Sequence, residues 1–120
     1  GTEIGGDAQL TGIGDGQAAT DAVVAHMEGQ SITGTAAQRA DGLSHGGYTD
    51  WFLPSKDELD LMYTNLHDQT PYPLGGFNTG SYWSSSEYIA DTAWLQFFGN
   101  GVQNFFLKLN TFRVRAVRAF

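Results

Sequence analysis

The side chains that could do chemistry in this chain are three consecutive serines and three histidines. Ser84–Ser86 offer hydroxyl nucleophiles, but the Gly-x-Ser-x-Gly turn that exposes a nucleophilic serine does not surround them. The histidines fall in different expected elements, so their spacing does not predict a metal site: His26, His45 and His67. We therefore expect no catalytic residue and predict that the domain is not an enzyme.

Carboxylates are the remaining candidates for a cofactor site. Glu87 and Asp91 could contribute to a Ca²⁺ site or could cap a loop, and we favour the cap. The acidic cluster at residues 57–60 has helical spacing and lacks the spacing of an EF-hand. The chain has no cysteine, which excludes thiol catalysis, disulfides and cysteine-ligated metal. We expect no cofactor and no bound metal.

Length and charge set further bounds. The 120 residues suit a single domain, 1–120, in which residues 1–11 are a loop or a trimmed end. The net charge of −7 argues against nonspecific nucleic-acid binding, and no apolar run reaches the length of a membrane span. All 13 acidic residues precede residue 92. Residues 92–120, which we call the tail, hold four basic residues and seven of the sixteen aromatic residues. The tail therefore differs from the rest of the chain in charge and in aromatic content.

Three short helices are expected in the first half of the chain. The composition of residues 17–27 is helical, and residues 35–43 begin at the capping-box pair Thr35 and Gln38. A second capping box, Ser55 with Glu58, begins a helix over residues 56–66. An apolar stripe at spacings i, i+3, i+4 and i+7 supports this helix: Leu59, Met62, Tyr63 and Leu66.

Antiparallel strands are expected to follow. Residues 48–53 are strand-like after a turn at Gly46–Gly47, and four further strands are predicted over residues 81–87, 93–98, 102–108 and 112–120. The last of these changes phase at residues 117–118, where we expect a bulge. Helices followed by a run of strands indicate an α+β fold.

The pair Asn100–Gly101 predicts a two-residue type I′ hairpin turn, which fixes the expected register. One face then carries Leu95, Phe97, Gly99, Val102, Asn104 and Phe106, and the other carries Trp94, Gln96, Phe98, Gln103, Phe105 and Leu107. Both faces are apolar, which fits a central strand pair buried on both faces or a binding surface on one of them. We favour the binding surface, because a domain of this size has a small interior, and we expect the residues of the first face to be surplus to the core.

The basic residues of the tail also have two interpretations. Arg113, Arg115 and Arg118 could form an anion site, or they could pair with upstream acidic residues and fix the tail to the domain. We favour the pairing.

Several segments together resemble one known family. They are GGYTDWFLPSKDEL at residues 46–59, YWSSSE at 82–87, Ala93–Trp94, Asn100–Gly101 and RVRAVRAF at 113–120. In this combination the chain resembles, over residues 12–120, the DUF1566 family, the domain at the C-terminus of the Legionella collagen-like adhesin. The resemblance implies a C-type lectin-like fold close to the formylglycine-generating enzymes. Those enzymes use cysteines, and sugar-binding lectins use calcium-binding motifs. Both features are absent from this chain, so the resemblance implies neither activity.

The tail also resembles the variable proteins of diversity-generating retroelements, in which adenine mutagenesis diversifies the 3′ end of a gene. This resemblance implies a variable region over residues 82–120. It implies these ligand-binding variable positions: Tyr88, Ile89, Asp91, Leu95, Phe97, Gly99, Val102, Asn104, Phe105, Phe106, Leu107, Leu109, Asn110 and Phe112. The expected scaffold residues are Trp51, Trp83, Trp94, Arg113 and Arg115.

These observations predict a receptor or adhesin domain that binds a protein or glycan on a cell surface. The resemblance implies an extracellular, cell-surface or virion location. The alternative is an adhesin of fixed specificity that binds an anionic polysaccharide through Lys108, Arg113 and Arg115. A third possibility is that the apolar face is an oligomer interface.

Overall fold

The computed structural model describes residues 4–31, 35–68, 76–77, 79–89, 92–108 and 110–118. Its elements confirm an α+β fold in which short helices precede an antiparallel sheet with the strand order β1-β2-β3. They are the 3₁₀ helix η1 (Gly6–Gln9), α1 (Gly16–Gly29), α2 (Ala36–Asp41), α3 (Lys56–Met62), the π-helical turn η2 (Tyr63–His67), β1 (Ser81–Ile89), β2 (Thr92–Phe97) and β3 (Gln103–Leu107).

Both predicted capping boxes are present. The Thr35 hydroxyl accepts a hydrogen bond from the Gln38 backbone N–H, and Gln38 accepts one from the Thr35 N–H. Ser55 and Glu58 make the same exchange at the start of α3. The Ser55 hydroxyl also donates to the Gly12 carbonyl at 2.7 Å, which ties α3 to the N-terminal segment.

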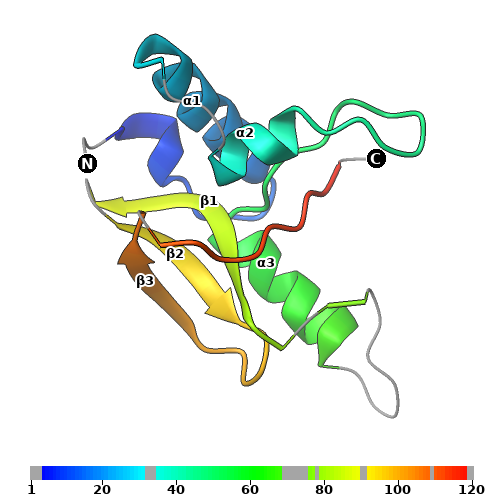
Figure 1. Cartoon of the computed structure of the whole chain (residues 1–120). Coiled ribbons are helices and arrows are strands. Elements are labelled where there is room, and N and C mark those ends of the chain that lie inside the picture. The colour runs from blue at the N-terminus through cyan, green and yellow to red at the C-terminus, as the bar shows by residue number, and fades with distance from the viewer. Residues whose placement is uncertain are drawn as a thin grey trace.

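The sheet lies between two helical layers (Figure 1), with η1, α1 and α2 on one side and α3 on the other. On the α3 side, Leu59, Tyr82 and Phe98 form a buried cluster, as the predicted apolar stripe requires. On the α1 and α2 side, Leu53 packs with Ala37 and Ala40. No helix in the described ranges is long and apolar enough to cross a membrane.

The hairpin between β2 and β3 differs from the prediction. Leu95 pairs with Asn104 rather than Phe106, and the bond from the Phe97 N–H to the Val102 carbonyl closes a four-residue loop. The cause is Phe98, which is 1% exposed and donates to the Gly80 carbonyl, so it belongs to the core rather than to a free strand end. The register moves by two residues, which leaves every side chain on its predicted face.

The predicted turn at Gly46–Gly47 is confirmed, with φ angles of 62° and 83° and mutual backbone hydrogen bonds between His45 and Tyr48. The residues after it form no regular strand. Phe52 makes an isolated bridge with Val117, and the Leu53 N–H donates to the buried Thr20 hydroxyl, which fixes this segment to α1.

The prediction of a regular fourth strand over residues 112–120 is wrong for its described part. Residues 112–118 run beside the other elements and make two isolated bridges, one between Arg113 and Tyr82 and one between Val117 and Phe52. Because the two bridges join different partners, no continuous ladder forms. The register irregularity lies instead in β1, between Trp83 and Glu87 and again between Glu87 and Ile89.

A candidate binding surface on the sheet

Five apolar side chains gather on the α3 side of the sheet, at the end that α3 does not cover. We call them the aromatic patch: Tyr88, Ile89, Trp94, Phe105 and Leu107. Four of them are 40–52% exposed, and Trp94 is half-buried among them. The strand pairing assembles the patch, since Trp94 lies opposite Phe105 while Ile89 and Leu107 flank Thr92.

The three rings of the patch pack against one another. Tyr88 and Phe105 are stacked, with centroids 4.1 Å apart and an interplanar angle of 12°. Trp94 meets both rings edge-on, at 5.2 Å from Tyr88 and 5.6 Å from Phe105. The Lys56 ammonium lies 4.6 Å from the Trp94 ring centroid, which adds a cation–π contact at the border with α3.

Polar contacts hold α3 over the other half of this sheet face. The Gln96 amide, which is fully buried, donates to the Asp60 carboxylate at 2.8 Å. The Gln103 amide donates to the Lys56 carbonyl at 2.7 Å. Because α3 begins at Lys56, it cannot extend over the strand ends beyond Trp94. The aromatic patch is therefore open to solvent.

The opposite face is covered to a greater extent than the sequence suggested. We expected its residues to be surplus to the core, but Leu95 is 1% exposed, and Phe97 and Phe106 are half-buried in mutual edge contact. Phe112, from the C-terminal segment, packs against Phe106 and Trp83 with centroids 5.8 Å and 5.0 Å apart. That segment supplies the cover, and Leu95 cannot contact a ligand in this conformation.

The other expected variable positions are dispersed. Gly99, Val102, Asn104 and Asn110 are exposed at the hairpin loop, on β3 and after it. Asp91 and Leu109 lie outside the described residues.

The expected scaffold residues take different positions. Trp83 is buried, and the Trp51 indole N–H donates to the Tyr48 carbonyl at 3.1 Å. Trp94, by contrast, is part of the aromatic patch. Its place there follows from the face that it shares with Phe105 in the predicted register.

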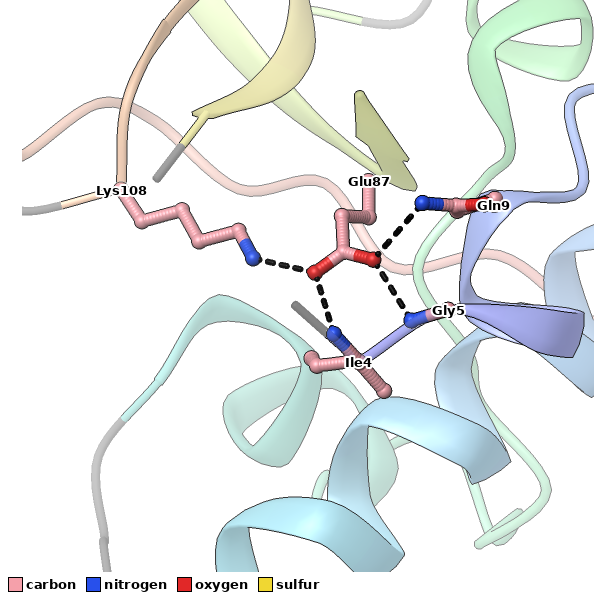
Figure 2. A network of polar contacts seen from close by, with 5 residues as sticks. All are labelled: Ile4, Gly5, Gln9, Glu87 and Lys108. Atoms are coloured by element: carbon pink, nitrogen blue, oxygen red, sulfur yellow. Dashed lines mark hydrogen bonds and ion pairs between the residues drawn. The ribbon is translucent and has the colours of Figure 1, made fainter. Parts of the chain in front are cut away.

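The buried carboxylate of Glu87 is the centre of a polar network (Figure 2). It accepts hydrogen bonds from the Ile4 and Gly5 backbone N–H groups, both at 2.8 Å, and from the Gln9 amide at 3.2 Å. The Lys108 ammonium completes the network at 2.5 Å. Burial raises the pKa of Glu87, but the bonds from Ile4, Lys108 and Gly5 outweigh it and hold the pKa below its usual value. Glu87 thus holds the segment before η1, as the cap interpretation implies.

The basic residues of the tail are mostly engaged within the domain. Arg118 donates to both carboxylate oxygens of Asp50, at 2.7 and 3.1 Å, and its guanidinium lies 3.6 Å from the Tyr48 ring centroid. Arg115 stacks on Phe77 at 4.2 Å, and Arg113 is exposed. The contact of Arg118 with Asp50 confirms the favoured pairing with an upstream acid for that residue, and Lys108 makes a similar pair with Glu87. For Arg113 and Arg115 the pairing stays a prediction.

Two hydroxyl groups of the serine run make hydrogen bonds within the domain. The Ser86 hydroxyl donates to the Leu10 carbonyl and accepts from the Lys56 N–H, and the Ser84 hydroxyl donates to the Trp94 carbonyl. Within the described ranges, no group of three or more histidine and acidic side chains could hold a metal ion.

Comparison with known protein families gives a match over most of the chain. The model of a protein family described as the Lcl C-terminal domain matches residues 13–118. No curated protein and no solved structure matches the chain.

Proposed function

The chain belongs to the Lcl C-terminal domain family, and from this premise we propose that it is a surface-exposed, adhesin-type domain that binds a protein or glycan ligand through the aromatic patch. The proposed role is binding rather than catalysis and needs no metal. Its location would be extracellular, on a cell surface or a virion. We also propose that the fold is C-type lectin-like, as the sequence resemblance implies.

The observation that carries the proposal is the exposure of four large apolar side chains on one patch. Tyr88 and Phe105 are each 40% exposed, and Ile89 and Leu107 are each 52% exposed. Contiguous apolar surface of this kind is uncommon on a soluble domain unless a partner covers it. Stacked rings lose little conformational entropy on binding, which favours aromatic side chains at binding surfaces.

We further propose that a retroelement diversifies this surface. Tyr88, Ile89, Phe105 and Leu107 are all residue types that adenine mutagenesis of an asparagine codon produces. They occupy surface positions at which a change of side chain leaves the buried clusters intact. Trp94 and the covered Leu95 would then be framework rather than variable residues.

Cell binding tests the patch. The labelled domain is incubated with intact bacterial and animal cells and bound fluorescence is measured by flow cytometry. The triple variant Tyr88→Ser, Phe105→Ser, Leu107→Ser should bind at least tenfold less than the wild type to any cell that the wild type binds. The matched control is Ile13→Ser with Leu61→Ser, which removes side chains 62% and 44% exposed outside the patch and should bind as the wild type does.

Two further results would contradict the patch proposal. Binding that survives the triple variant and disappears at about 0.5 M salt would favour an anionic polysaccharide held by the basic residues, because salt screens charge contacts. A chain that sediments as a stable oligomer, and as a monomer in the triple variant, would make the patch an oligomer interface.

The coding DNA tests diversification separately. A reverse-transcriptase gene and a template repeat should lie nearby, with adenines at the template codons for Tyr88, Ile89, Phe105 and Leu107. A neighbourhood without both elements overturns the diversification proposal and leaves the binding proposal standing.

A further inference from the structure

A concave site lies on the opposite side of the sheet from the aromatic patch. It is a groove of about 730 Å³ between α1 and α2 on one wall and β1 with residues 110–112 and Val114 on the other. This size lies within the usual range for small-molecule sites. In Figure 1 the two helices face β1 across this region. Apolar side chains from both walls line it, among them Val23, Met27, Trp83 and Phe112.

Ser85 provides a polar group in the wall of the groove that the protein itself does not satisfy. The residue is 4% exposed, and its hydroxyl has no hydrogen-bond partner within the described part of the chain. A buried hydroxyl without a partner costs about 1–3 kcal/mol. The adjacent Ser84 hydroxyl also lines the groove, but it donates to the Trp94 carbonyl at 2.8 Å. Ser85 therefore keeps a donor and an acceptor for a bound molecule.

The charges of Glu87 and Lys108 in the groove wall already compensate each other. Glu87 accepts four hydrogen bonds, one of them from Lys108, so this ion pair offers little attraction to a charged ligand. Arg39, at the exposed rim, has an interaction of its own. A charged ligand would lose hydration without gaining a free counter-charge.

We propose that this groove is a binding site for a small uncharged molecule that has an apolar body and one hydroxyl or amide group. The apolar body lies between α1 and Phe112. The polar group exchanges a hydrogen bond with the Ser85 hydroxyl, which is out of contact with solvent in this structure and reaches the groove when its side chain rotates. The site is separate from the aromatic patch, so it does not depend on the function proposed above.

Benzyl alcohol and benzoate are matched probes, because they share a ring and differ in charge. The test is a titration of the isotope-labelled domain followed by NMR. Benzyl alcohol at millimolar concentration should shift the backbone signals of Met27, Trp83 and Ser85, and benzoate should bind at least tenfold more weakly. Equal affinity for the two probes, or no shifts at the groove, overturns the proposal and leaves the groove to solvent.

The variant Ser85→Ala separates a ligand anchor from a structural serine. It removes a hydroxyl without a protein partner, so the thermal midpoint should stay the same or rise, while benzyl alcohol binds about tenfold more weakly. The control Ser86→Ala removes a satisfied hydroxyl outside the groove lining, so it should lower the midpoint and keep the affinity. Unchanged affinity in Ser85→Ala, or a midpoint as low as that of Ser86→Ala, contradicts the assignment.

Discussion

The Lys108 Nζ atom lies 2.5 Å from Oε2 of Glu87, although the two residues are 21 positions apart. The Glu87 side chain is 1% exposed, and the same carboxylate also accepts from the Ile4 and Gly5 N–H groups. One buried charge thus joins the residues after β3, the end of β1 and the N-terminal segment. The aromatic patch includes Tyr88 and Leu107, the neighbours of this pair in sequence, so the network also fixes their backbone.

Glu87→Gln should destabilise the domain by about 3 kcal/mol, because it leaves the Lys108 ammonium and a backbone N–H without a charged acceptor. Urea denaturation followed by tryptophan fluorescence measures the loss. Glu28→Gln changes an exposed glutamate on α1 and should shift stability by less than about 0.5 kcal/mol. Equal effects of the two variants would mean that the network contributes nothing to folding.

The contribution of Glu87 should also depend on pH. Its pKa in the folded protein is lowered from the ordinary value of 4.5, so its stabilisation is present above that value. The stabilisation is lost as pH falls through the lower folded-state pKa. The stability difference between wild type and Glu87→Gln should therefore be constant from pH 7 to pH 5 and narrow in more acidic solution. A difference that widens on acidification would contradict the assigned direction.

The ion pair of Asp50 and Arg118 should lower the pKa of Asp50 measurably but contribute little to the stability of the domain. The Arg118 guanidinium beside Asp50 holds the pKa of that carboxyl below its usual range. Carbon-detected NMR titration should show this lowered pKa and its return to the ordinary value in Arg118→Gln. Because Asp50 is exposed, the variant should unfold at nearly the wild-type urea concentration. An unchanged Asp50 pKa in the variant would place its cause elsewhere.

Gly101→Ala should be more destabilising than Gly47→Ala. Both glycines have a positive φ, 79° and 83°, so each alanine pays about 1 kcal/mol of backbone strain. At Gly101 an added Cβ would also lie 2.4 Å from Tyr63 Cε2, whereas at Gly47 it meets no atom within 4 Å. We expect Gly101→Ala to cost at least about 1 kcal/mol more. Equal losses in urea denaturation would show that Tyr63 moves aside freely.

The local elements of the fold could be predicted from the sequence because their determinants are local. A capping box needs residues three positions apart, and the apolar stripe of α3 needs one helical face. The loop after β2 was predicted wrongly because Phe98 belongs to a cluster with Leu59 and Tyr82, which are distant in sequence. The partners of Arg113 and Val117 are likewise distant in sequence. The sequence around these two residues therefore predicted a continuous strand, whereas the structure has two isolated bridges.

The sequence predicts which residues of the candidate site share one face of the sheet. It does not predict whether another segment of the chain covers that face. Strand alternation places Trp94, Phe105 and Leu107 together in either register, since a shift of two residues preserves the face. The covering of the opposite face depends on Phe112, which reaches Trp83 from the C-terminal segment. No spacing rule within the hairpin predicts that contact, so the sequence alone does not show which apolar face stays open.

Tolerance to substitution should separate the exposed from the covered members of the expected variable set. Leu107 is 52% exposed, and Leu107→Ala should change the free energy of unfolding by less than about 0.5 kcal/mol. Leu95 is 1% exposed, and Leu95→Ala should cost about 2–5 kcal/mol, because it leaves a cavity in the sheet core. Urea denaturation of the two variants gives the comparison directly. If Leu95→Ala were as stable as Leu107→Ala, the core could repack around position 95, and that position would return to the set open to diversification.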